Sequence, residues 1–215
     1  MDEVIKYFLY VGSGIELTLE LLLGAFLLGV FLGLLVAILK YNKIGNFILD
    51  RLVSILRGTP LILQLGLIYY ALPKITGFKP TVLSAGIIAL GLNSSAYVSE
   101  ILRSGIENLP KGQFEAAKTL KVPSFYMWKD IILPQVIRNI LPSIVNEAIS
   151  LLKETALIST IGGMDLMRRS QTLAAEQFDF FTPLCIAGLY YYFMVLLIEF
   201  AGKKLEKKVA YVKNK

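Results

Sequence analysis

Ionisable side chains interrupt otherwise apolar stretches of this sequence. Glu100 ends one uncharged run, and Glu147, Lys153 and Glu154 are spread along another apolar segment. A carboxylate accepts hydrogen bonds from ammonium or guanidinium groups, and a lysine ammonium donates to carboxylates. Burying such groups in hydrocarbon costs about 2.5 to 3.5 kcal/mol on insertion scales, so they are expected to face a cavity or a partner.

Neutral polar side chains accompany these charges. They are Asn93, Ser94, Ser95 and Tyr97 in one segment, with Thr59 and Gln64 in an earlier one. Hydroxyl and amide groups of this kind give an apolar pocket donors and acceptors for a bound molecule. The same groups can instead satisfy one another, with serines bonding carbonyls one turn back and Lys153 pairing with a glutamate. Both interpretations stay open for each residue, and for Glu147 the structural one is favoured.

Other kinds of chemistry are excluded by the composition. The sequence contains no histidine and one cysteine, Cys185, so no zinc-type spacing and no metal site is predicted. The chain also has no phosphate-binding loop, which predicts no bound ATP or other cofactor. We therefore expect a protein that is not itself an enzyme.

Long apolar runs must position these groups. Apolar residues make up 55% of the 215 residues, and the mean hydropathy is +0.64. Residues 21–39, 80–99 and 180–198 carry no charge at all, whereas residues 58–73 and 131–161 are shorter or interrupted. About 20 apolar residues span a hydrocarbon core, and all five segments are interpreted as spans.

The predicted fold is an all-α membrane protein with five transmembrane helices. The spans are placed at about residues 15–40, 52–74, 80–104, 130–160 and 180–202. They form one transmembrane domain over residues 13–205, preceded by an interfacial segment at 1–12 and followed by a basic tail at 206–215. Gly29 and Gly33 permit a neighbouring helix to approach closely. A span of the same chain is the favoured neighbour, and a helix of another subunit is the alternative.

The basic residues predict the orientation. If the spans alternate, 16 of the 22 Lys and Arg residues fall on one side of the membrane. That side is expected to be cytoplasmic, which places the N-terminus outside and the C-terminus inside a multi-pass protein of the cytoplasmic membrane. Anionic lipid headgroups explain basic residues beside span ends, so no nucleic acid partner is expected.

A polar segment separates the third and fourth predicted spans. Its centre, residues 112–121, is rich in helix formers and lies between Pro110 and Pro123. A helix of about three turns that projects from the membrane in this way needs a partner, because no other segment of this chain is left to cover it.

Three motifs carry a resemblance to a known family. They are the segment from Glu115 to Leu166, which begins "EAAKTLKVPSFYMWKDIILPQ" and includes the following span; "RGTPLILQL" at residues 57–65; and "NSSAYVSEILRSGI" at residues 93–106. In this order they resemble the permease subunits of ATP-binding-cassette (ABC) importers, specifically the polar amino acid branch. The resemblance covers about residues 13–205.

The resemblance implies roles for the polar segment. The helix at about 112–121 would be the coupling helix that docks on a separate ATPase subunit. Glu115 would meet a basic residue there, Ala116 and Ala117 would let the two backbones approach, and Leu120 and Lys121 would complete the surface. The family has glycine where this chain has Lys121, a left-handed position that lysine fills poorly, although Pro123 still ends the helix.

It also implies partners and a transported solute. Two ATPase subunits would hold ATP and Mg, a second permease subunit would be identical or homologous, and a binding protein outside the membrane would deliver polar amino acids, basic ones being candidates. Glu154 would pair with a cationic solute side chain, and Arg57, with Gly58 and Pro60, would have a structural or gating role or anchor to lipid phosphate. The alternatives are a secondary carrier, a channel or a membrane scaffold.

Overall fold

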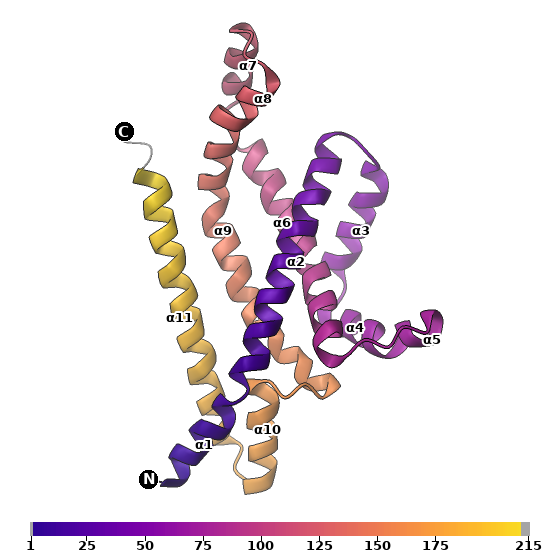
Figure 1. The fold of residues 1–215 in the computed structure, drawn as a ribbon, viewed down its shortest axis with the longest axis vertical. Helices are drawn as coiled ribbons and strands as arrows, with labels where there is room; N and C mark the ends of the chain where they lie inside the picture. The colour runs from indigo at the N-terminus through magenta and orange to yellow at the C-terminus, as the bar shows by residue number, and fades with distance from the viewer. Residues whose placement is uncertain (1, 212–215) are drawn as a thin grey trace.

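The computed structural model describes residues 2–211, and over these residues the protein is helical, without strands. Four long helices form its body: α2 (Ile15–Tyr41), α6 (Val82–Glu107), α9 (Leu133–Glu154) and α11 (Phe181–Tyr211). Figure 1 shows them running roughly along the long axis of the molecule, with the start of α1 at one end of that axis and the end of α11 towards the other.

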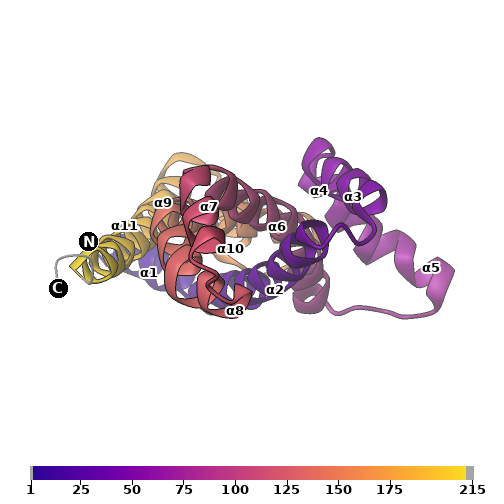
Figure 2. The same cartoon turned by 90° about the horizontal axis from the view of Figure 1, so that it is seen from above.

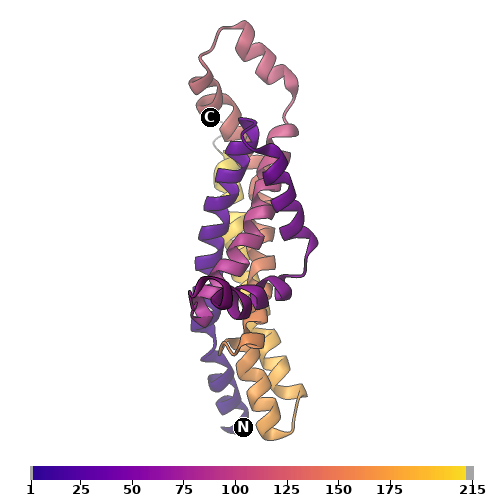
Figure 3. The same ribbon diagram turned by 90° about the vertical axis from the view of Figure 1, so that its right-hand side faces the viewer.

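Short helices occupy the two ends. Helices α1 (Asp2–Gly12) and α10 (Leu166–Gln177) lie at the end that holds the N-terminus, where both pack beside α11 (Figure 1). Helix α7 (Lys111–Thr119), α8 (Ser124–Tyr126) and the π-helical segment η2 (Met127–Ile132) project at the other end, best seen in Figure 3. A 3₁₀ segment, η3 (Thr155–Ile161), follows α9.

The second predicted span is not one straight helix. Helix α3 (Asn46–Gly58) is followed by α4 (Leu61–Gly66), a π-helical segment η1 (Leu67–Ala71) and α5 (Leu72–Thr76), and the chain bends by 104° at the break. Thr59 is extended there because the ring of Pro60 disfavours a helical residue before it. Figure 2 shows α3 to α5 extending to one side of the bundle.

Three helical segments among the described residues are long and apolar enough to cross a membrane. They are Glu3–Tyr41, Val82–Glu107 and Phe181–Val209, and the bent pair α3 and α4–α5 makes a fourth if it counts as one span. The segment predicted to lie at the interface thus forms, over its described residues 2–12, an almost continuous helix with the first span. Part of the basic tail belongs to α11, whereas Lys213 and Lys215 lie outside the described residues.

The core is built on close contact between α2 and α6. A Cβ atom added at Gly29 would lie 2.8 Å from the Ser94 side chain, and one at Gly33 would lie 2.7 Å from Val98. The prediction that these glycines pack against a span of the same chain is confirmed. A second, smaller apolar cluster joins α7 to the start of α9; it contains Leu109, Ala117, Met127, Ile132, Val136 and Ile140.

Candidate functional site

Helix α9 carries most of its polar side chains on one face. From Asn139 onward these are Asn139, Ser143, Asn146, Glu147, Ser150, Lys153 and Glu154, whereas Arg138 lies on another face. At 3.6 residues per turn they fall within about a third of the helix circumference and extend about 22 Å along its axis. We call them the α9 polar stripe. The charged residues that stand out in this apolar segment are only part of the α9 polar stripe. The neutral members could have been found in the sequence from their spacing of three or four residues, which places them on the same helix face.

A second stripe follows α6. It consists of Asn93, Tyr97, Glu100, Ser104 and Asn108, which are three or four residues apart and so share one face. Helices α6 and α9 pack along each other, and Ser94 Oγ donates a hydrogen bond of 2.6 Å to Glu147 between them. Two polar faces are therefore held side by side in a largely apolar bundle.

The two stripes border a groove in the half of the molecule nearest α7. Its volume is about 430 Å³, and its polar lining comes from α3, α6 and α9: Arg57, Tyr97, Glu100, Arg103, Ser104, Asn108, Asn139 and Ser143. We call it the inner groove. Cavities of about 300 to 1,000 Å³ are typical of small-molecule sites, so it is large enough for a molecule of that class.

Three of the predicted contact residues stabilise the bend after α3. The side-chain amide of Gln64 donates to the Leu56 carbonyl oxygen at 2.8 Å and to the Thr59 hydroxyl at 2.9 Å. Asn93 also donates to the Leu56 carbonyl, at 2.9 Å. Because the break removes the helical partners of such carbonyls, these amides satisfy acceptors that would otherwise stay unpaired. The sequence motif thus holds the bend in place.

The two serines beside Asn93 are turned into the bundle. Ser94 is 1% exposed and bonds to Glu147, while Ser95 is 5% exposed and donates to the Leu92 carbonyl of its own helix at 2.7 Å. Ser95 thus bonds to a carbonyl one turn back. This is the structural interpretation that the sequence left open beside a contact with a solute.

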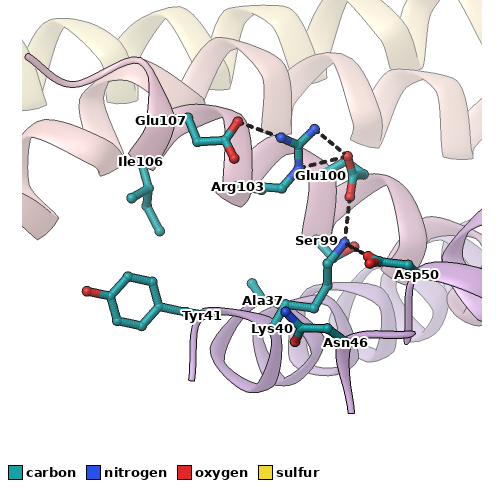
Figure 4. A pocket seen from close by; sticks show the side chains of 10 residues that line it. All are labelled: Ala37, Lys40, Tyr41, Asn46, Asp50, Ser99, Glu100, Arg103, Ile106 and Glu107. Carbon is teal, nitrogen blue, oxygen red and sulfur yellow. Dashed lines mark hydrogen bonds and ion pairs between the residues drawn. The ribbon is translucent and has the colours of Figure 1, made fainter. Parts of the chain in front are cut away.

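Glu100 lies at the centre of an ion-pair cluster near the C-terminal end of α6. Lys40 of α2 contacts Asp50 of α3 at 2.7 Å and Glu100 at 3.1 Å, and Arg103 contacts Glu100 at 2.7 Å (Figure 4). Arg103 also pairs with Glu107. This cluster of five charged residues links three helices. The sequence indicated only Glu100 as a candidate, because the other four lie near predicted span ends, where charged residues are common.

Arg57 approaches the same glutamate less closely. Its guanidinium lies 3.8 Å from Glu100 and over the ring of Tyr97, 5.2 Å from the centroid. Its side chain is 44% exposed, against 18% for Glu100. Part of the guanidinium therefore remains accessible from the inner groove that it lines.

The opposite end of the α9 stripe is formed by Lys153 and Glu154. Lys153 is exposed and Glu154 is partly buried. The α-helix ends at Glu154, the tighter η3 segment follows, and Gly162 then adopts a left-handed conformation with φ of 89°. The backbone therefore leaves the regular helix next to this carboxylate.

Helix α7 has two different faces. Ala117 is 3% exposed and belongs to the cluster that packs α7 against the start of α9, so it does not face outward as the family resemblance implied. Glu115 and Ala116 are exposed, and Leu120 is 76% exposed. Part of α7 is thus covered by its own chain, contrary to expectation, and the remaining face is available to a partner.

Lys121 takes over the role of the expected glycine. Its φ is 51°, in the left-handed region, and its N–H bonds to the Lys118 carbonyl while that of Val122 bonds to the Ala117 carbonyl, both at 3.0 Å. These two bonds define a Schellman cap. A lysine therefore closes this helix with the geometry that glycine usually provides.

Known proteins are similar to this chain over most of its length. The family of binding-protein-dependent transport system inner membrane components matches residues 29–211. A putative glutamine transport system permease of Rickettsia typhi is 48% identical over 96% of this chain and 97% of its own length. An arginine transport system permease of Bacillus subtilis is 44% identical over 93% of this chain and 92% of its own length.

Solved structures agree with this result. The crystal structure of an amino acid ABC transporter with histidines has a TM-score of 0.88 and 36% identity, covering 96% of this chain and 97% of that one. An inward-facing methionine ABC transporter, at 19% identity and a TM-score of 0.76, shares the fold. The chain therefore belongs to the binding-protein-dependent inner membrane components, the permease subunits of ABC importers, in which ATP hydrolysis is performed by a separate subunit.

Proposed function

We propose that this permease forms the path by which polar amino acids cross the cytoplasmic membrane, and that the path follows the polar stripes of α6 and α9. The observation that carries the proposal is the stripes themselves. Exposed groups such as Asn139, Ser143 and Lys153 are too costly to place against lipid tails, so they are expected to border water, a solute or another subunit.

The transported solute is a zwitterionic amino acid. Its ammonium needs acceptors and its carboxylate needs donors, and the stripes supply both kinds of group. The relatives named for glutamine and arginine transport support this class of solute. Glu154 is our candidate for pairing with a cationic side chain, because it is an acidic group of the α9 stripe next to the end of the helix.

Five membrane crossings follow if α9 and the bent pair α3 to α5 are both counted as spans. Helix α9 falls outside the apolar set because its stripe is charged, but it is 22 residues long and packs between α6 and α11. An odd number of crossings fits the start of α1 and the end of α11, which lie towards opposite ends of the long axis (Figure 1). With the basic side inside, the N-terminus is outside and α7 projects into the cytoplasm.

The exposed face of α7 is the proposed coupling surface. Glu115, Ala116 and Leu120 would dock on an ATPase subunit that binds ATP and Mg, one such subunit for each of two permease subunits. A binding protein would deliver the amino acid at the α10 end. No family or structural match supports a secondary carrier or a channel.

Reconstitution tests this function. The permease, the ATPase subunits and the binding protein, placed in liposomes, should accumulate labelled arginine or glutamine only when ATP is supplied. Uptake by the permease alone, or uptake that does not depend on ATP, would contradict the proposal.

A further inference from the structure

The inner groove contains a cation that is not fully used by the protein. Around Glu100, Arg103 contacts the carboxylate with two nitrogens, at 2.7 and 3.1 Å, and Lys40 adds a contact at 3.1 Å. The third cation, Arg57, is 3.8 Å away. Since Glu100 already accepts three shorter bonds, Arg57 is the cation that this carboxylate holds least closely, and with 44% of its side chain exposed it can bind another anion.

The position of Arg57 suits a bound carboxylate. A guanidinium presents five N–H donors in a planar fork that matches a carboxylate in a bidentate arrangement. The Tyr97 ring lies against the guanidinium and leaves its edge to the groove, which is about 430 Å³ in volume. Figure 4 shows the neighbouring part of the cluster, where Arg103 is directed towards Glu100 and Glu107.

The other side of the groove offers acceptors. Asn139 and Ser143 of the α9 stripe and Ser104 of α6 carry amide or hydroxyl oxygens that accept from an ammonium group. An α-amino acid places its ammonium and carboxylate on one carbon atom. Glu100 also lines the groove, but its charge is already paired with Arg103 and Lys40. Arg57 on α3, together with the neutral acceptors on α9 and α6, is therefore complementary to that part of every amino acid, whatever its side chain.

We propose that the inner groove is a second binding position for the transported amino acid, in which Arg57 binds the α-carboxylate. The proposal rests on the proposed function and deepens it. Glu154 lies about 22 Å along α9 from Asn139, so the two positions are distinct. Because the inner groove lies towards α7, it is open to amino acid that has already accumulated in the cytoplasm.

Occupancy would also act on the bent segment. Helix α3 has one buried residue, Val53, among those described, and it is held mainly by polar contacts of Asp50, Arg57 and the Leu56 carbonyl. A carboxylate that binds Arg57 competes with Glu100 for the guanidinium and weakens one of these contacts. Amino acid on the cytoplasmic side should therefore slow the importer.

The test uses the complete importer in proteoliposomes, with α7 facing the outer medium, ATP in that medium and labelled arginine with the binding protein inside. Unlabelled L-arginine added outside should inhibit the transport of labelled arginine from the inside into the medium. Agmatine, which lacks the carboxylate, should not inhibit it. Arg57→Gln should raise the half-inhibiting arginine concentration at least fivefold. Asn139→Ala, a milder change of an exposed residue, should raise it about two- to threefold if an ammonium contact is lost.

Controls distinguish a carboxylate site at Arg57 from a general charge effect and from a lipid contact. Arg51→Gln removes the same charge from the same helix, at a residue that contacts Phe47 and does not line the inner groove, and should leave inhibition unchanged.

Equal inhibition by arginine and agmatine, or an unchanged half-inhibiting concentration in both groove variants, would overturn the proposal. A dependence of Arg57 variants on phosphatidylglycerol, with no response to arginine, would assign the guanidinium to lipid phosphate and also overturn it. ATP-driven transport without such inhibition would leave the permease function standing, whereas absence of ATP-driven transport would refute both.

Discussion

Ser94 on α6 and Glu147 on α9 are joined by a hydrogen bond of 2.6 Å, although they are 53 positions apart in the chain. Ser94 also lies against Gly29, so three helices, α2, α6 and α9, meet at this pair. The bond fixes how the two polar stripes face each other, because a shift of α9 would separate the carboxylate from the hydroxyl.

Replacing Ser94 by alanine should destabilise the protein. The change keeps the Cβ that packs against Gly29 but leaves a half-buried carboxylate without its donor, which costs about 1.5 to 3 kcal/mol. We expect a lower melting temperature of the detergent-purified complex. Ser95→Ala is the control, since that hydroxyl bonds only within its own helix, and an equal loss for both variants would contradict the role of the pair.

Replacing Glu154 by glutamine should impair transport of cationic amino acids selectively. Loss of a charge-assisted bond of about 1.5 to 3 kcal/mol corresponds to at least a tenfold loss for arginine, whereas glutamine import should change little. Import of the two labelled amino acids by the reconstituted importer measures this. Lys153→Gln, next to it on the same stripe, should produce no selective loss for arginine. Equal effects of Glu154→Gln on both amino acids would argue against the predicted contact.

Replacing Glu115 by arginine should uncouple the permease from its ATPase. The residue is exposed on α7 and outside the cluster that supports this helix, so the variant should still insert and assemble its fold. We expect ATP hydrolysis that no longer drives import. Gln113→Arg introduces the same side chain about 200° around the helix, with a charge change of +1 in place of +2, and should preserve coupling. Normal import by Glu115→Arg would rule out the docking role.

Replacing Lys121 by glycine should stabilise the end of α7. A side chain in the left-handed region costs about 1 kcal/mol that glycine avoids, which corresponds to roughly fivefold slower local opening. Hydrogen exchange of the Val122 amide, which closes the cap on the Ala117 carbonyl, should slow by that factor. Lys118→Gly, within the helix, should accelerate it. Faster exchange in Lys121→Gly would mean that the cap depends on lysine itself.

Asp165 gives the protein a pH-dependent stability. It lies in the loop before α10 and is fully buried, and burial raises its pKa, although the Arg168 N–H and the Tyr191 hydroxyl, at 2.9 and 3.1 Å, oppose the shift. The folded state therefore binds the proton more tightly than the unfolded state. Its contribution to stability is fully present below the unfolded pKa of about 4 and is lost as the pH rises through the raised folded pKa.

Asp165→Asn tests this assignment, because the amide does not titrate, keeps an oxygen for the Arg168 N–H and turns its NH2 group to the Tyr191 hydroxyl, whose oxygen can accept. The melting temperature of the wild type should rise relative to that of the variant as the pH falls from 7.5 to 5. A difference that stays constant over this range would show that Asp165 does not titrate as its burial requires.

The sequence by itself determined the helical class, the apolar spans and the family. Uncharged runs long enough to cross a bilayer are local properties, and the helix at about 112–121 with prolines on both sides is recognisable from residue order alone. The contact of Gly29 and Gly33 with another span was also predictable, because close packing of helices requires small residues at regular spacing.

Tertiary structure alone decided which polar groups share a surface. That Gln64 and Asn93 both bind the Leu56 carbonyl depends on a 104° bend after α3, and the meeting of Ser94 with Glu147 depends on how α9 packs on α6. It also decided that Ala117 faces inward while Glu115 faces outward. Helical periodicity fixes which residues lie on one face, but the partner of that face is set by long-range packing, which no local pattern records.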